Sequence, residues 1–257
     1  DRVPVVILVH GSGPSNMDES MGPNAPFRDL AEGLSRRGVA VLRYDKRTFV
    51  CPQFFENAKE GYTYDDETVD DAISAVRLVK DSLGKKMAID PSRIYIVGHS
   101  MGGMLAPRIA QRSGDVAGIV LLAAPTGKLI PTIERQLAYL GRSAEEIRQL
   151  TEIALADIPD SYLDLDARYS DTATAQELNI PMLILQGERD YQVTMDDYRT
   201  WREAVGNRQG VVMKSYPSLN HLFMAGKGGS MPEEYQTPGH VAEEVMDDIA
   251  NFVLSGK

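Results

Sequence analysis

The chain has 257 residues, of which 43% are hydrophobic and 25% charged, enough for one sizeable globular domain. Its net charge of −10 disfavours nucleic acid or an anionic membrane surface as a partner, and no stretch is long and apolar enough to span a bilayer. The single cysteine, Cys51, excludes an internal disulfide and a cysteine-rich metal site.

Short apolar runs alternate with amphipathic segments along the chain. The predicted strands cover residues 3–10, 39–44, 94–97, 118–123, 180–186 and 211–216. The predicted helices cover residues 27–37, 65–83, 101–111, 130–140, 144–156 and 241–253. This alternation predicts an α/β fold with a mostly parallel, doubly wound sheet and helices on both faces.

Three features qualify this pattern. Residues 45–63 are predicted to be irregular, and Asp90-Pro91 is expected to turn the chain into the third strand. Pro107 lies inside a predicted helix, where we expect a kink or an irregular turn, because proline removes a helical hydrogen bond.

A long insertion without a strand candidate, residues 129–177, separates the fourth and fifth strands. It leaves the carboxyl edge of the sheet, where open α/β sheets bind ligands. We therefore expect a small helical cap over a single catalytic core of residues 1–128 and 178–257; a surface hairpin without a role is the alternative. Ser143 is expected to cap the second of its helices.

The sequence Gly98-His99-Ser100-Met101-Gly102 follows a buried strand and precedes a helix. It matches G-x-S-x-G in the context of a nucleophile elbow, a strained turn that exposes its serine above the sheet. Ser100 is therefore the candidate nucleophile. The first helical N–H, that of Met101, is expected to face a developing oxyanion.

A serine nucleophile needs a histidine base and an acid that orients it. His10 is expected to brace the first loop, and His99 to point away from its neighbour Ser100. His240 is expected to be exposed. His221, in a loop at the carboxyl edge, is therefore the candidate base. The candidate acid is Asp190, after the fifth strand, with Glu188 as the alternative; the order Ser, Asp, His is that of α/β-hydrolases.

The loop Gly11-Ser12-Gly13-Pro14, after the first strand, is expected to provide the second oxyanion donor. The N–H of Ser12 is the first candidate and that of Gly13 the second. A phosphate-binding loop is excluded because no Lys-Ser/Thr follows the glycines. No HExxH or cluster with metal-ligand spacing occurs, so we expect neither a metal nor a cofactor.

Together, His10-Gly11-Ser12-Gly13-Pro14, the elbow, Gly187-Glu188-Arg189-Asp190 and Asn220-His221 resemble the α/β-hydrolase superfamily. With Arg43-Tyr44-Asp45-Lys46-Arg47, the chain resembles bacterial carboxylesterases of the EstD type, which are related to acyl-peptidases and dienelactone hydrolases. The resemblance implies Ser100, Asp190 and His221 as catalytic triad, and Ser12 and Met101 as oxyanion donors. Family sheets usually have two strands before the one followed by His-Gly, and here none precedes it.

The sequence therefore predicts a serine carboxylesterase for a small-molecule ester. Apolar residues of the insertion would favour short acyl groups: Leu129, Ile130, Leu137, Tyr139 and Leu140. An acyl-peptidase or other amide hydrolase, and a non-catalytic binding protein with this fold, are the alternatives. The chain lacks an initiator methionine and a signal peptide, so we expect a processed or trimmed form. Compartment and oligomeric state stay open.

Overall fold

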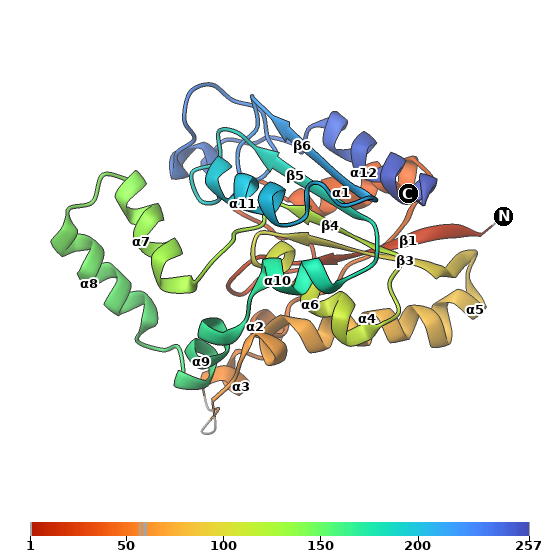
Figure 1. The fold of residues 1–257 in the computed structure, drawn as a ribbon, viewed down its shortest axis with the longest axis horizontal. Coiled ribbons are helices and arrows are strands. Elements are labelled where there is room, and N and C mark those ends of the chain that lie inside the picture. Colours follow the sequence, from red (N-terminus) through yellow and green to blue (C-terminus); the bar gives the residue numbers. More distant parts are fainter. Residues whose placement is uncertain (1, 57, 59–60, 257) are drawn as a thin grey trace.

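The computed structural model describes residues 2–56, 58 and 61–256, and its core is a parallel six-stranded sheet with the strand order β2-β1-β3-β4-β5-β6 (Figure 1). The strands are β1 (Val3–Val9), β2 (Ala40–Leu42), β3 (Ile89–His99), β4 (Gly118–Leu122), β5 (Met182–Gly187) and β6 (Val211–Tyr216). Every neighbouring pair is parallel, as the repeated strand–helix pattern predicts. The predicted fold class is confirmed.

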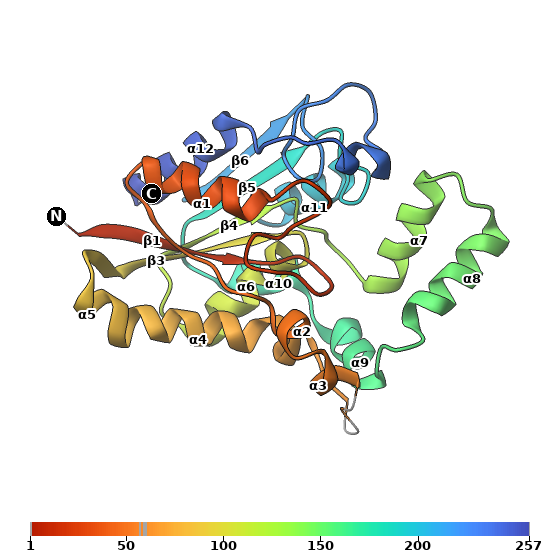
Figure 2. The same cartoon turned by 180° about the vertical axis from the view of Figure 1, so that it is seen from behind.

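Helices cover both faces of this sheet (Figures 1 and 2). The α-helices are α1 (Pro26–Arg36), α2 (Arg47–Val50), α3 (Pro52–Glu56), α4 (Asp70–Leu78), α5 (Gly84–Lys86), α6 (Met101–Ser113), α7 (Leu129–Tyr139), α8 (Ala144–Leu155), α9 (Asp160–Arg168), α10 (Asp171–Glu177), α11 (Met195–Val205) and α12 (Glu243–Ser255). Two π-helical turns, η1 (Asp65–Val69) and η2 (Val79–Leu83), flank α4, and η3 (Pro232–Gln236) is a 3₁₀-helix.

The core has two layers because alternate side chains of each strand point to opposite faces. Val6 and Leu8 of β1 belong to the layer that contains α1 and α12, whereas Val5, Ile7 and Val9 belong to the layer that contains α4, α6 and α11. These five side chains are at most 1% exposed, so β1 is buried on both faces, as its continuous apolar run predicts.

The segment predicted as irregular, residues 45–63, is partly helical. It forms α2 and α3, and Pro52 occupies the first position of α3, where its missing N–H costs nothing. Positions 57, 59 and 60 of this segment lie outside the described residues. The second strand is shorter than predicted and ends at Leu42.

Two prolines lie inside regular elements. Asp90-Pro91 lies inside β3, at the point where its register with β1 shifts, and an irregular ladder tolerates a residue without an N–H. The helix α6 continues through Pro107 without an irregular turn. Nine of its 13 residues are buried between the sheet and neighbouring helices, so tertiary packing outweighs the local cost of the proline.

The insertion between β4 and β5 folds into four helices, α7 to α10, of which α7 and α8 stand away from the sheet (Figure 1). The side chain of Ser143 accepts a hydrogen bond from the N–H of Glu146 and completes a capping box at the start of α8, as predicted. By contrast, α10 packs against α6 and α11. No residue of α7 is buried, all of them being described, and of the described α8 residues only Thr151 is.

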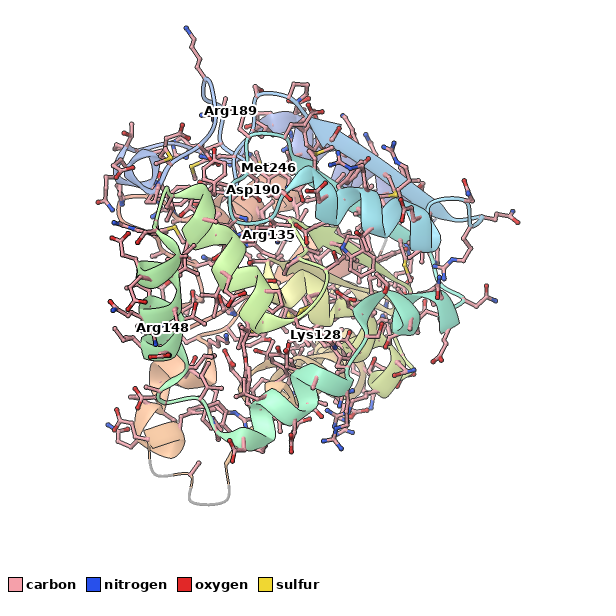
Figure 3. The ribbon with its side chains drawn as sticks, turned by 60° about the vertical axis from the view of Figure 1, so that its left-hand side comes forward. Lys128, Arg135, Arg148, Arg189, Asp190 and Met246 are labelled. Atoms are coloured by element: carbon pink, nitrogen blue, oxygen red, sulfur yellow. The ribbon has the colours of Figure 1, made fainter. Side chains whose placement is uncertain are left out.

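Polar contacts attach α7 to the body of the molecule. Arg135 lies 3.0 Å from a carboxylate oxygen of Asp197, and Gln136 donates to the carbonyl of Gln192 at 3.1 Å. Figure 3 places Arg135 beneath the loop that carries Arg189 and Asp190. These contacts hold the insertion over the carboxyl edge of the sheet. None of the helices in the described ranges is long and apolar enough to cross a membrane.

Candidate active site

Ser100 occupies the sharp turn between β3 and α6. Its φ of 53° and ψ of −121° are unusual for a residue with a side chain, as expected of a nucleophile elbow. The N–H of Ser100 donates to the carbonyl of Leu122 at 2.8 Å, which fixes the turn to β4. Strain at this position therefore persists because the surrounding backbone holds it.

The two glycines of the elbow are required by close backbone contacts. A Cβ at Gly98 would lie 2.2 Å from the carbonyl oxygen of Gly102, and a Cβ at Gly102 would lie 2.2 Å from that of Val9. Neither obstacle is a side chain that could move aside. The elbow can therefore form only with glycine on both sides of Ser100.

His221 and Asp190 form a buried pair in the loops that follow β6 and β5. Nδ1 of His221 lies 2.6 Å from Oδ2 of Asp190, and the two residues are 3% and 5% exposed. The other oxygen of Asp190 accepts from the N–H groups of Gln192 and Val193, at 2.8 and 3.1 Å. This carboxylate is held in place by backbone donors and orients one nitrogen of the imidazole.

Glu188, the alternative acid, lies elsewhere. Its side chain is exposed and accepts a hydrogen bond from Ser215 at 2.8 Å. Of the two acidic residues that follow β5, Asp190 is therefore the one paired with His221.

His99 joins the elbow to the loop of His221. Its Nε2 lies 3.0 Å from the carbonyl oxygen of His221, and the two rings are 4.7 Å apart between centroids. Its Nδ1 lies 2.9 Å from Oε2 of Glu19, as an ion pair in which both residues are buried. As predicted, His99 is directed at groups other than its neighbour Ser100.

The pKa values of this pair are shifted in opposite directions. Burial by itself lowers the pKa of His99, but the carboxylate of Glu19 outweighs it and holds that pKa above 6.5. Burial by itself raises the pKa of Glu19, and His99 outweighs it, so this pKa lies below 4.5. Both members of the pair are therefore charged between pH 4.5 and 6.5.

The other two histidines are also where the sequence predicts them. His10 places Nε2 3.0 Å from the carbonyl oxygen of Asn16 and thereby braces the loop after β1. Burial lowers its pKa, which favours the neutral ring. His240 has a side chain that is 82% exposed.

The loop after β1 is held from both sides of Gly11. The N–H of Gly11 donates to Oε1 of Glu19 at 2.7 Å, and its carbonyl accepts from Nζ of Lys46 at 2.8 Å. The N–H groups of Ser12 and Met101 have no assigned acceptor among the described residues. They are thus unused donors beside Ser100, as an oxyanion site requires.

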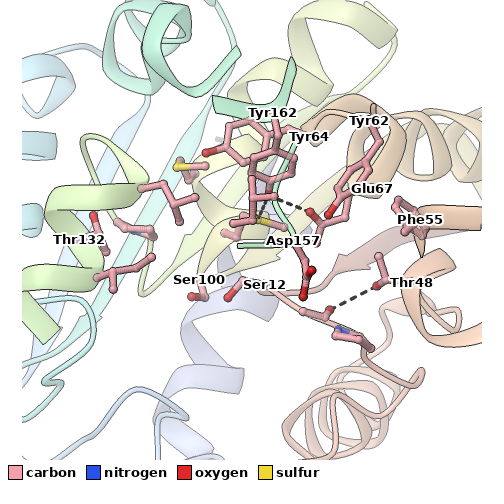
Figure 4. Close-up of a pocket in the computed structure, with 18 of the residues that line it drawn as sticks. Ser12, Thr48, Phe55, Tyr62, Tyr64, Glu67, Ser100, Thr132, Asp157 and Tyr162 are labelled. Atoms are coloured by element: carbon pink, nitrogen blue, oxygen red, sulfur yellow. Dashed lines mark hydrogen bonds between the residues drawn. The ribbon is translucent and has the colours of Figure 1, made fainter. Parts of the chain in front are cut away.

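A cavity of about 680 Å³ opens over Ser100 between the sheet edge, α2–α3 and the inserted helices (Figure 4). Ser12 and Met101 also line it. Its wall combines aromatic and apolar side chains with a few acidic ones: Phe55, Tyr62, Tyr64, Met104, Leu129, Ile133, Ile158 and Tyr162, with Glu56, Glu67 and Asp157. Of the apolar residues that the sequence suggested for this role, only Leu129 is among the lining residues. Ile130 is exposed, and the ring of Tyr139 stacks on Tyr191, outside the cavity wall.

Three buried charged residues beside the site could not be predicted from the sequence: Glu19, Lys46 and Glu67. Each lies far along the chain from its partner and belongs to a segment that reads as an ordinary polar stretch. Lys46 belongs to the motif Arg43-Tyr44-Asp45-Lys46-Arg47, which by itself indicates no role for its side chain. Whether a charged side chain is buried depends on the tertiary structure, because charged residues are mostly exposed.

The parallel sheet, the elbow and the paired His221 and Asp190 at its carboxyl edge are features of the α/β-hydrolase class. Residues 6–246 match the model of the alpha/beta hydrolase family, and the chain belongs to this family. Among curated proteins it is similar to Esterase EstD of Thermotoga maritima, with 40% identity over 266 residues that cover 98% of this chain. The chain spans 62% of the length of EstD.

Solved structures of esterases share the fold. The Pyrococcus furiosus esterase Pf2001 is 18% identical with a TM-score of 0.62, over 98% of this chain and 81% of that one. The hyperthermophilic esterase of the archaeon Pyrobaculum calidifontis is 19% identical with a TM-score of 0.61, over 99% and 77%. At this identity, the likeness concerns the fold.

Proposed function

We propose that this protein is a serine carboxylesterase that hydrolyses short-chain esters of small molecules. The observation that carries the proposal is the strained turn that exposes Ser100 to a cavity, at the same sheet edge as the buried pair of His221 and Asp190. The similarity to EstD supports the reaction class. No step of this reaction requires a metal or a cofactor.

In the proposed mechanism, Oγ of Ser100 attacks the ester carbonyl while His221 takes its proton. Asp190 orients the ring and stabilises the imidazolium that forms. The negative charge on the former carbonyl oxygen is held by the N–H groups of Ser12 and Met101. His221 then returns the proton to the leaving alcohol, and an acyl-enzyme remains on Ser100.

Hydrolysis of the acyl-enzyme completes the cycle, with water as the nucleophile and Ser100 as the leaving group. His221 deprotonates the water, which attacks the acyl carbonyl, and the same two N–H groups hold the second tetrahedral anion. Collapse releases the carboxylic acid and restores the hydroxyl of Ser100. We propose that the inserted residues 129–177 act as a cap that bounds the acyl group, over a core of residues 1–128 and 178–257.

The test is hydrolysis of p-nitrophenyl esters from acetate to laurate by wild type and Ser100→Ala, with Ser113→Ala at the far end of α6 as a matched control. We expect the highest kcat/KM for the shortest acyl chains. Ser100→Ala should lose on the order of 10⁵–10⁶-fold in kcat, whereas Ser113→Ala should not. A folded Ser100→Ala protein that hydrolyses esters at the wild-type rate would contradict the proposal. Cleavage of acyl-amino-acid amides without esters would assign an amide hydrolase instead.

A further inference from the structure

Lys46 is a buried lysine that lies behind the candidate oxyanion loop, Gly11-Ser12-Gly13-Pro14, which follows β1. The residue is 1% exposed, and its ammonium contacts two groups, the carbonyl oxygen of Gly11 at 2.8 Å and Oε1 of Glu67 at 2.5 Å. It follows β2 in the sequence Arg43-Tyr44-Asp45-Lys46-Arg47 and is not among the residues that line the cavity. Lys46 therefore does not contact substrate in the cavity, and it can affect the site only through the backbone of the loop that it binds.

The carbonyl that Lys46 binds belongs to the same peptide group as the N–H of Ser12. This peptide is trans, as are all described peptides, so its C=O and N–H lie in one plane and point in opposite directions. A donor fixed on the carbonyl oxygen therefore sets the direction of the Ser12 N–H on the other side. Because the donor is charged, it also polarises the peptide and strengthens the N–H as a donor.

The neighbouring peptide is fixed as well. The N–H of Gly11 donates to Glu19 at 2.7 Å, so the two peptide groups that flank Gly11 are each held by a buried charged side chain. Glycine permits the close approach of this loop to the elbow, because a Cβ at Gly11 would lie 3.1 Å from Cβ of Ser100. The loop is thus clamped in contact with the nucleophile.

Glu67 keeps Lys46 in position. Its Oε1 binds the ammonium, and its Oε2 accepts a hydrogen bond from the hydroxyl of Tyr162 at 2.8 Å, in the inserted helix α9. The Tyr162 hydroxyl also lies 3.5 Å from Sδ of Met101. Both oxygens of the carboxylate are therefore occupied, one by Lys46 and the other by Tyr162 of the inserted helices. Figure 4 shows Glu67 and Tyr162 together in the wall of the cavity.

We propose that Lys46 is a positioning residue of the oxyanion site, which aims and polarises the Gly11–Ser12 peptide so that the Ser12 N–H stabilises the tetrahedral anion. The inference rests on the proposed esterase function. A purely structural ion pair would stabilise the fold, and its loss would affect bound substrate and transition state alike. The positioning role instead acts only when negative charge develops on the substrate oxygen.

The experiment compares Lys46→Met with the double variant Lys46→Met/Glu67→Gln, because the single change leaves a buried carboxylate without its counter-charge and can prevent folding. Lys80→Met, which removes the lysine of an ion pair with Asp115 remote from the site, is the matched control. Folding is checked by circular dichroism and the thermal midpoint. The readouts are kcat and KM for p-nitrophenyl acetate and the inhibition constant of a trifluoromethyl ketone, which forms an anionic tetrahedral adduct with a serine.

We expect the folded double variant to lose about 10- to 100-fold in kcat, less than the 10²–10³-fold typical of losing an oxyanion donor outright. KM should change by less than about threefold, and the affinity for the trifluoromethyl ketone should fall by the same factor as kcat. Lys80→Met should match wild type in all three quantities.

A folded double variant with kcat and ketone affinity within about twofold of wild type would overturn the inference. So would a loss that appears in KM alone, because that result indicates a general disturbance of substrate binding. Failure of the proposed function is recognised separately. It appears as wild-type protein without ester hydrolysis, or as full activity of Ser100→Ala, and either result also removes the basis of this inference.

Discussion

Nδ1 of His99 lies 2.9 Å from Oε2 of Glu19, and this buried pair ties the elbow strand to the loop after β1. The other carboxylate oxygen of Glu19 holds the N–H of Gly11, while the far nitrogen of His99 meets the carbonyl of His221. One ion pair thus connects three segments that carry the candidate oxyanion loop, nucleophile and base.

The charges of this pair predict how its contribution to stability depends on pH. The pKa of His99 is raised in the folded protein, so its contribution is fully present below pH 6.5 and is lost as the pH rises through the folded pKa. The pKa of Glu19 is lowered, so its contribution is present above pH 4.5 and is lost as the pH falls through the folded pKa. The pair therefore stabilises the fold most between pH 4.5 and 6.5.

We expect His99→Gln to lower the free energy of unfolding by about 3–5 kcal/mol near pH 5.5, the usual cost of breaking a buried pair, and by less at pH 9. Urea denaturation at the two pH values measures this difference. His240→Gln is the control, because the exposed pair of His240 with Asp29 should contribute about 0–1 kcal/mol. Equal destabilisation by His99→Gln at both pH values would contradict the argument.

The assignment of the acid predicts a large difference between two neighbouring acidic residues. Asp190→Asn should lower kcat by about 10⁴-fold, because the amide can hold His221 in the wrong tautomer and cannot stabilise the imidazolium. Glu188→Gln should stay within about twofold of wild type, because this side chain is exposed and binds only the hydroxyl of Ser215 among the hydrogen bonds assigned to it. Steady-state kinetics on p-nitrophenyl acetate decide, and the reverse ranking would transfer the role to Glu188.

The oxyanion proposal concerns the backbone of Ser12, and not its hydroxyl. Ser12→Ala keeps the N–H and should retain kcat within about threefold, whereas Ser12→Pro removes the donor and should lose about 10²–10³-fold. Position 12 is exposed in its loop, which limits the effect of either change on folding. Comparable kcat values for the two folded variants would show that the donor lies elsewhere, with Gly13 as the next candidate.

The close backbone contacts of Gly102 predict that adding a methyl group at this position destabilises the fold. Gly102→Ala should lower the free energy of unfolding by about 3 kcal/mol or more, because the new Cβ meets the carbonyl oxygens of Val9 and His10 at 2.2 and 2.6 Å. Gly239→Ala is the control, since the atoms nearest to its Cβ belong to side chains and not to the backbone: Sδ of Met224 at 3.1 Å and Oδ1 of Asn24 at 3.9 Å. Thermal unfolding measures both, and a Gly102→Ala midpoint equal to that of the control would be the contrary result.

The fold class and the elbow could be predicted because their signals are local. A continuous apolar run indicates a strand buried on both faces, as in β1, and Gly-His-Ser-Met-Gly between a strand and a helix indicates a sharp turn. His221 could be selected since only four histidines exist and three had other expected places. Each of these inferences uses residues that are adjacent in the chain, or a short process of elimination.

The sequence by itself therefore determined the six strands in their order along the chain, the strained serine and the short set of candidate partners, whereas α9, α10 and α11 appear only in the structure. Only the tertiary structure decided that Asp190 and not Glu188 faces His221, that Pro107 stays within a helix, and that Lys46 lies beneath Gly11. The physical reason is the separation along the chain over which each signal acts, because periodicity and turn chemistry involve only a few neighbouring residues. Pairing of buried charges depends on which distant segments the packed core brings within about 3 Å.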